Sequence, residues 1–220
     1  MLPRPASSWT RKPWRRSTGP LASLTRVPRV KVRSQREVVD RCRELAAEVW
    51  TGLSRLPDGE GDPVVVDAVW RGESLGALLW TLGLVELSPY DEPFDHAALV
   101  DAPLEDAELR DAEEIEHELE TARLWHWRAR TMLLQQNGSV ELPERWESFD
   151  QLVAATAMRG FEQGLLPAPL RGDFRAYGKI YRHLTEDQHA DALSIALERH
   201  HALAWAAGYG ESWDDVPLDT

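Results

Sequence analysis

The sequence contains very little cysteine and no long apolar run. Cys42 is the only cysteine among 220 residues, which excludes both an internal disulfide and a zinc site built from cysteines. The longest apolar stretch, residues 75–85, is interrupted by Gly76 and Gly83 and is shorter than the roughly 20 residues needed to cross a bilayer. We therefore expect a soluble protein of the cytoplasm without a membrane partner.

The common catalytic motifs are also missing. There is no glycine-rich phosphate loop, because Gly72, Gly76 and Gly83 are scattered, and there is no G-x-S-x-G elbow of a serine hydrolase. Cys42 falls on the apolar stripe of a predicted helix, which is typical of an inert core thiol. The sequence thus points to no catalytic residue and to no cofactor.

Acidic residues are absent from the first 36 positions, which carry ten arginines and lysines. The remaining chain has 15 basic and 37 acidic residues, a net charge of −22. A body with this charge repels nucleic acid and suits a basic protein partner. Nucleic acid could bind only through residues 1–36.

Residues 1–33 form a basic N-terminal extension that we expect to be disordered, because it shows no helical periodicity. A start codon assigned too far upstream in a GC-rich genome would give the same composition, and a transit peptide or a functional basic arm are alternatives. Residues 34–220 are expected to form one helical domain.

Helical periodicity dominates from Ser34 onward. Capping boxes are predicted at Ser34 with Glu37 and at Thr185 with Gln188, and Gly83 and Gly208 are predicted to end helices. Helices are expected over residues 34–56, 72–82, 105–135, 148–163 and 185–208. Val64 to Val66 fit a short strand or the start of a helix, and residues 177–181 should be extended or loosely turned. The fold class is therefore mainly α, a single compact multi-helix domain with long loops and room for one short strand pair.

The last predicted helix groups several polar side chains. Its phasing turns His200 toward the core and places Glu198, His201 and Trp205 on one outer face. Arg199 lies between the two faces, where it could bind carboxylates of the C-terminal tail. We interpret it as part of a structural latch whose acceptors are Asp214, Asp215 and Asp219.

An alternative is a ligand pocket that uses the same helix and the long central helix. Its candidate residues are His126, Trp127, Glu198, Arg199, His201 and Trp205. Ten tryptophans are more than a chain of this length usually has, so two or three could line a groove, and Trp127 is the best surface candidate.

A metal site finds little support. Glu113 and His117 are four residues apart and could reach one ion, but two ligands do not make a site, and neither HExxH nor paired E-x-x-H motifs occur. We interpret this acidic stretch as a solvated helix face.

An ordered set of short motifs resembles the bacterial family catalogued as domain of unknown function 4272, over residues 32–220. The motifs are Val32-Arg33-Ser34, Trp70-Arg71-x-Glu73, Leu78-Leu79-Trp80-x-Leu82-Gly83-Leu84, Leu109-Arg110-x-Ala112-Glu113-Glu114-Ile115, His126-Trp127, Gly178-Lys179-x-Tyr181 with Leu184, Glu198-Arg199-His200-x-Ala202-Leu203-x-Trp205, and Trp213-Asp214-Asp215-Val216 with Asp219-Thr220. The chain departs from the family pattern at Leu124 and Ala204, where polar residues are usual. The resemblance implies a mainly helical cytosolic protein and supplies no activity.

Two hypotheses for function follow. The first is a non-catalytic, acidic helical protein that binds a partner, for example by neutralising a basic protein such as a toxin. The second is an enzyme or small-ligand-binding protein that uses the pocket near His126, Trp127, Glu198, Arg199 and His201.

Overall fold

The computed structural model describes residues 31–55, 63–136, 138, 142 and 146–218. The principal helices are α1 (Gln35–Ser54), α2 (Pro63–Thr81), α4 (Ala112–Gln136), α5 (Phe149–Glu162) and α6 (Glu186–Ala206). Shorter elements are α3 (His96–Val100), the 3-10 turns η4 (Leu104–Asp106), η5 (Tyr181–His183) and η6 (Trp213–Asp215), and the strands β1 (Arg175–Ala176) and β2 (Lys179–Ile180). The predicted fold class, one mainly helical domain with a short strand pair, is confirmed.

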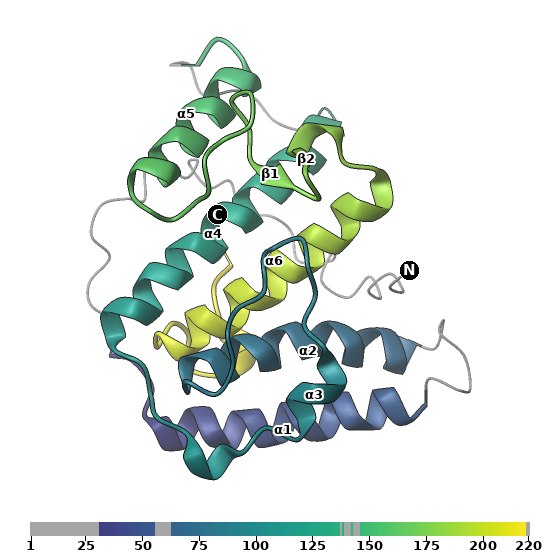
Figure 1. Cartoon of the computed structure of the whole chain (residues 1–220), viewed down its shortest axis with the longest axis vertical. Coiled ribbons are helices and arrows are strands. Elements are labelled where there is room, and N and C mark those ends of the chain that lie inside the picture. Colours follow the sequence, from purple (N-terminus) through teal and green to yellow (C-terminus); the bar gives the residue numbers. More distant parts are fainter. Residues whose placement is uncertain (1–30, 56–62, 137, 139–141, 143–145, 219–220) are drawn as a thin grey trace.

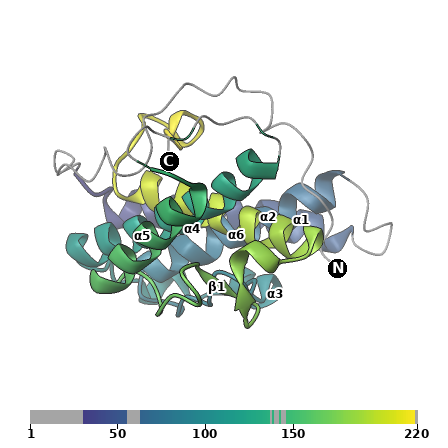
Figure 2. The same ribbon diagram turned by 90° about the horizontal axis from the view of Figure 1, so that it is seen from above.

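The long helices pack in the order α1, α2, α6, α4, α5, so the last helix in the sequence lies at the centre of the row (Figure 1). Figure 2 shows the C-terminal tail on one side of this row, with α3 and β1 on the other. Because α2 and α4 cover two sides of α6, little of its C-terminal half is left for solvent. Every residue from Arg199 to Ala207 is accordingly buried.

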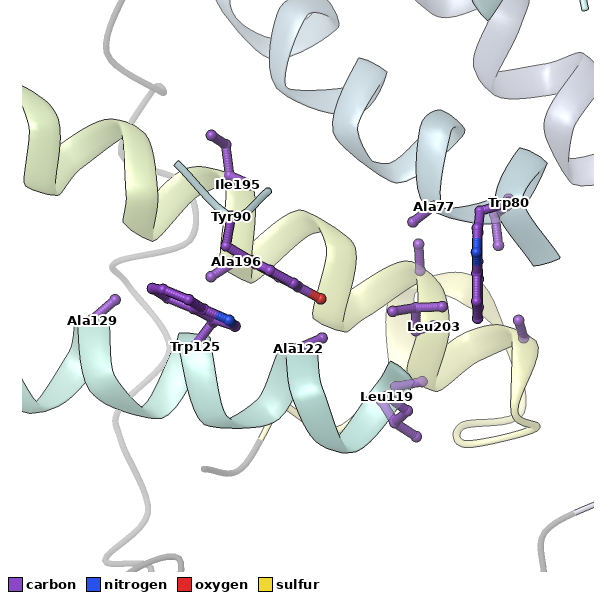
Figure 3. Packing of buried hydrophobic residues seen from close by; sticks show 14 of the residues in the cluster. Ala77, Trp80, Tyr90, Leu119, Ala122, Trp125, Ala129, Ile195, Ala196 and Leu203 are labelled. Carbon is purple, nitrogen blue, oxygen red and sulfur yellow. The ribbon is translucent and has the colours of Figure 1, made fainter. Parts of the chain in front are cut away.

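One hydrophobic core runs through the row (Figure 3). Ala122 and Trp125 of α4 face Ala196 of α6, and the Tyr90 ring stacks on Trp125 with ring centroids 5.4 Å apart. Cys42 belongs to this core and is fully buried, and burial raises the pKa of its thiol to about 12. The cysteine is therefore a packing residue, as predicted.

The helix ends follow local sequence signals. The capping boxes at Ser34 and Thr185 are both present. Gly83 (φ +69°) and Gly208 (φ +89°) end α2 and α6 in the left-handed conformation that glycine adopts without strain. Both ends form Schellman motifs, because the N–H groups of Leu84 and Tyr209 donate to Leu79 and Ala204.

Two helix starts differ from the predictions. α2 already begins at Pro63, so the stretch at residues 64–66 starts a helix rather than a strand. α4 begins at Ala112 instead of residue 105, because the N–H groups of Glu108 and Arg110 donate to the carbonyls of Leu82 and Thr81 at the end of α2. That pairing keeps residues 107–111 out of the helix.

The stretch predicted to be extended or loosely turned, residues 177–181, contains the hairpin turn and β2, while β1 precedes it. β1 and β2 pair antiparallel, with Ala176 opposite Lys179, and the two turn residues Tyr177 and Gly178 have φ values of +51° and +68°. Positive φ at both positions is the geometry of a type I′ hairpin turn.

The predicted N-terminal extension lies mostly outside the described residues, since the structure begins at Lys31. Arg33 belongs to the fold, because its backbone N–H donates to the carbonyl of Ala206 at 2.9 Å and its guanidinium donates to the carbonyls of Trp205 and Gly210. Arg33, which the prediction assigns to the extension, therefore contacts the helical domain.

Gly76 lets the loop of residues 86–96 lie directly on α2. A Cβ atom at Gly76 would lie 2.4 Å from the ring of Phe94. We expect Gly76→Ala to lower the free energy of unfolding by about 1–3 kcal/mol, despite the better helix propensity of alanine. In a Phe94→Ala background the same change should be neutral or stabilising. Urea denaturation of the four chains of this cycle tests the contact, and additive effects would contradict it.

Candidate functional site

Four of the six side chains predicted to form a pocket belong to α6. Arg199 is fully buried and binds Glu73 of α2, which is also fully buried. Its Nε and Nη2 atoms donate to Glu73 Oε2 at 2.9 and 2.8 Å. The prediction that Arg199 binds Asp214 or Asp215 is therefore wrong, and Asp219 lies outside the described residues. Helix phasing predicted an intermediate face for Arg199, but α6 is covered by α2 on that side.

Arg199 also holds the loop of residues 86–96. Its guanidinium donates to the carbonyls of Ser88, Pro89 and Glu92 at 2.6, 3.3 and 3.0 Å. It lies 5.1 Å from the ring centroid of Tyr90 and 4.5 Å from that of Phe94. Every donor of the guanidinium is therefore used within the fold.

Glu73 has two further partners. Its Oε1 atom lies 2.9 Å from His96 Nε2 and accepts the backbone N–H of Phe94 at 2.9 Å. Burial raises the pKa of Glu73, but the bond to His96 and the charge of Arg199 outweigh it and hold the pKa below the ordinary value. Glu73 is therefore a buried anion that joins α2 to α3 and to α6.

His126 and His200 form a buried pair between α4 and α6. Their Nδ1 atoms are 2.9 Å apart, so one neutral ring donates and the other accepts. Burial lowers the pKa of His126 to about 3 and that of His200 well below its ordinary value. The predicted core position of His200 is confirmed, and both histidines are neutral structural residues.

Glu198 lies against α2. Its Oε2 atom accepts from Ser74 Oγ at 2.7 Å, and burial raises its pKa to about 7. Ser74 is fully buried and Glu198 is half-buried, and the hydrogen bond between them engages both side chains. Trp127 is 5% exposed, and its predicted surface position is wrong because the strand-pair region covers it through Phe174.

A C-terminal latch does exist, but it uses the indole of Trp213 in place of the aspartates. His201 Nε2 donates to the carbonyl of Trp213 at 2.9 Å, and the ring of His201 meets the indole edge-on at 4.4 Å. Trp205 packs against the same indole at 5.5 Å, and the guanidinium of Arg41 lies 4.1 Å from its centroid. Arg33 lies over Trp205 at 4.5 Å. Both ends of the domain are thus fastened to the end of α6.

The six predicted pocket residues consequently do not converge on one cavity. Arg199 binds Glu73, His126 binds His200, Glu198 binds Ser74, and His201 and Trp205 hold the tail. Three cavities at the surface of the described residues are lined by other side chains.

A groove that sequence reasoning missed lies between the end of α2 and the start of α4. Its volume is about 440 Å³, and its lining residues are Trp80, Arg110, Glu113, Glu114, His117 and Glu118. We call it the acidic groove. Residues 105–120 contain nine acidic residues and a single arginine or lysine. The predicted solvated helix face is confirmed, because Glu113, Glu114, Glu116 and His117 are exposed, and the groove lies along it.

Arg110 is that one base, and its guanidinium is bound inside the groove. The guanidinium lies 4.9 Å from the ring centroid of Trp80, and its Nε donates to the carbonyl of Trp80 at 2.7 Å. Glu114 and Glu86 lie 3.6 and 4.0 Å from the same guanidinium. The groove therefore combines an indole wall with carboxylates, the environment that favours an arginine side chain.

Glu118 forms the inner end of the groove. It accepts the hydroxyl of Tyr90 at 2.8 Å, and burial raises its pKa to about 6, so it is mostly charged at neutral pH. Through Tyr90 the groove is connected to the loop that Arg199 holds. The buried pair of Arg199 and Glu73 thus supports one wall of the acidic groove.

One comparison with known proteins finds a match that contains the acidic groove. A family model described as a domain of unknown function (DUF4272) matches residues 54–145. The chain resembles that family. The matched stretch is shorter than the one expected from the motifs, yet it includes Glu73 and every residue that lines the acidic groove. No curated protein and no solved structure matches the chain.

Removing Arg199 should leave Glu73 as an unpaired buried charge. We expect Arg199→Met to lower the free energy of unfolding by about 3–5 kcal/mol. Adding Glu73→Met should restore part of this loss, because both charges are then gone. Arg43→Met, which removes an exposed arginine from α1, serves as the control and should cost at most about 1 kcal/mol. Urea denaturation followed by circular dichroism measures all four chains, and a double variant no more stable than Arg199→Met would contradict the assignment.

The buried histidines should make the protein less stable in mild acid. Burial lowers the pKa of His126 to about 3 and of His201 to about 4, and it also lowers the pKa values of His189 and His200. The unfolded chain binds these protons near pH 6.5 and the folded chain does not, so stability is lost as the pH falls below 6.5. Glu198 and Glu118 act in the opposite sense, because their raised pKa values let the folded chain bind protons first.

Four histidines outweigh two glutamates, so the free energy of unfolding should fall between pH 7 and 5. His126→Gln should flatten this slope by up to about 1.4 kcal/mol per pH unit, the value for one proton. His183→Gln alters an exposed histidine and should leave the slope unchanged. Denaturation curves measured between pH 7 and 5 give the slope of the free energy of unfolding for each variant. Equal slopes for both variants would refute the role given to His126.

Proposed function

We propose that this protein is a non-catalytic, acidic helical protein that binds a basic protein partner through the acidic groove. The observation that supports the proposal is the guanidinium of Arg110, which packs on the Trp80 ring and pairs with Glu114 within the groove wall, the kind of contact that a partner's arginine would make. Glu113, Glu114 and Glu118 line the same groove, and Glu113 and Glu114 are exposed. Arginine and lysine side chains of a partner would meet these carboxylates.

The charge of the whole chain supports the same partner class. From residue 37 onward the net charge is −22, which attracts a basic protein at long range and raises the rate of encounter.

The surplus of tryptophan, by contrast, mainly serves the core. Of the eight tryptophans among the described residues, five are buried.

The interior supports a binding role more than a catalytic one. Catalysis needs titratable groups that reach a substrate. The buried histidines, Glu73 and Glu198 all have partners inside the fold, and Ser74 is fully buried. Among the described residues, no group of three or more potential metal ligands is arranged around one point. None of the described helices combines the length and the apolar composition of a membrane-spanning segment.

Binding of a fluorescein-labelled arginine-rich peptide tests the proposal. Fluorescence anisotropy should show binding at 50 mM salt that weakens at 200 mM salt, because the contacts are exposed charges. Glu113→Gln/Glu114→Gln should weaken binding roughly tenfold, since two exposed pairs at up to about 1 kcal/mol each are lost. Glu147→Gln/Glu162→Gln removes the same charge beside and on α5 and is the matched control.

Equal binding by both double variants would contradict the assignment of the groove, and no binding by the parent chain would contradict the proposed function. Thermal unfolding of each variant verifies that the fold is kept. A pull-down from native lysate at low and moderate salt, with the parent and groove variants as baits, then selects partners that depend on the groove.

A further inference from the structure

Arg110 fills a defined place on the wall of the acidic groove. Its guanidinium carbon lies 4.9 Å from the ring centroid of Trp80, its Nε atom donates to the carbonyl of Trp80 at 2.7 Å, and its Nη1 atom faces Glu114 at 3.6 Å. An aromatic face, an acceptor carbonyl and a carboxylate suit a planar guanidinium better than an ammonium group. The wall is therefore complementary to an arginine side chain.

Arg110 is held less firmly than the buried arginines Arg199 and Arg128. Each of those two donates two hydrogen bonds to one carboxylate at 2.7–2.9 Å. The side chain of Arg110 is 25% exposed, and its carboxylate contacts are longer, 3.6 Å to Glu114 and 4.0 Å to Glu86. Both glutamates are exposed, so these two ion pairs contribute little.

The backbone at Arg110 is anchored separately from the side chain. Its N–H group donates to the carbonyl of Thr81 at 2.8 Å, and the neighbouring N–H of Leu109 donates to Gln35 Oε1 at 3.4 Å. Rotation about the side-chain bonds is therefore enough to withdraw the guanidinium from Trp80, while the backbone contacts of the groove stay intact.

We propose that Arg110 is a resident occupant of an arginine-binding site on Trp80, and that an arginine side chain of the basic partner displaces it. The inference rests on the proposed function and specifies it, because the groove then selects arginine over lysine. The incoming guanidinium takes over the ring, the carbonyl and the carboxylate that Arg110 leaves. A lysine ammonium has no planar face to lie on the indole, so it pairs with the carboxylates and leaves Arg110 in place.

The resident side chain also controls access to the indole. Trp80 is only 9% exposed in the free protein, because Arg110 and the core cover it. A single arginine gains nothing over the resident one, since the contacts are the same. A partner segment gains more, because its other basic side chains reach Glu113 at the same time, and contacts made together add to the affinity.

Peptide selectivity provides the first test, on the full chain. The fluorescein-labelled arginine-rich peptide is compared with its all-lysine counterpart at low salt. If Arg110 covers the indole about nine-tenths of the time, Arg110→Gln should tighten binding of the arginine peptide roughly tenfold. Binding of the lysine peptide should tighten by about twofold at most, through the loss of one repelling charge.

Arg36→Gln is the matched control for charge. Arg36 is 92% exposed on α1, next to Gln35, which is bonded to residues 107 and 109. Its removal should tighten both peptides equally and by about twofold at most, because no aromatic face is uncovered. Thermal unfolding of each variant verifies that the fold is kept.

Exchange of the Arg110 side-chain proton provides the second test, on the parent chain. The Nε–H signal in a ¹⁵N spectrum is assigned by its absence in Arg110→Lys. In the free protein its bond to the Trp80 carbonyl should slow exchange with water. Saturating arginine peptide should accelerate this exchange several-fold, whereas the lysine peptide should leave it unchanged.

The outcomes separate the inference from the proposed function. Equal tightening of both peptides by Arg110→Gln, or an Nε–H signal that the arginine peptide leaves unchanged, overturns the inference. The proposed function then still stands, because the groove binds with Arg110 in place. Absence of peptide binding by both the parent and Arg110→Gln overturns the proposed function and the inference together. If Arg110→Gln loses the fold, the exchange measurement on the parent decides alone.

Discussion

The buried ion pair of Arg199 and Glu73 is the constraint on which the remaining structure depends. Two opposite charges with no solvent exposure require that all remaining donors and acceptors find partners. Glu73 finds His96 and the N–H of Phe94, and Arg199 finds three carbonyls between residues 88 and 92. The pair therefore fixes α6 against α2 and at the same time fixes the loop that supports Tyr90 and the inner end of the acidic groove.

A second buried arginine forms a similar ion pair on α4, although its Nη1 atom is buried without a hydrogen-bond partner. Arg128 of α4 binds Asp173 through Nε and Nη2, at 2.7 and 2.9 Å. Asp173 in turn accepts the backbone N–H groups of Phe174 and Arg182, which flank the hairpin. Irregular segments carry unsatisfied backbone groups, and burying them is costly unless partners are supplied. In this fold, charged side chains from the central helices supply those partners.

These long-range pairs also explain what the sequence could and could not predict. The caps at Ser34, Thr185, Gly83 and Gly208 depend on residues within one turn, so local patterns predicted them correctly. Arg199 and Glu73 are 126 residues apart. Phasing assigns Arg199 to a face of α6, but it cannot show that α6 is the central helix with both sides covered. For the same reason phasing places His201 on an outer face, whereas it is buried against Trp213. The acidic stretch is the solvated helix face that its composition predicts, but its groove forms only where α2 and α4 meet, which no local pattern shows.

The acidic groove has an energetic cost that bears on its role. Glu114 and Glu118 are four residues apart on α4, as are Glu116 and Glu120, and like charges at this spacing destabilise a helix. The acidic residues of the first turn gain some compensation from the helix dipole, but those of the second and third turns do not. Arg110 is the single base in the stretch and compensates only part of the charge. Under the proposed function, a cationic partner bound here would relieve this repulsion and so stabilise the fold, because binding and folding are linked.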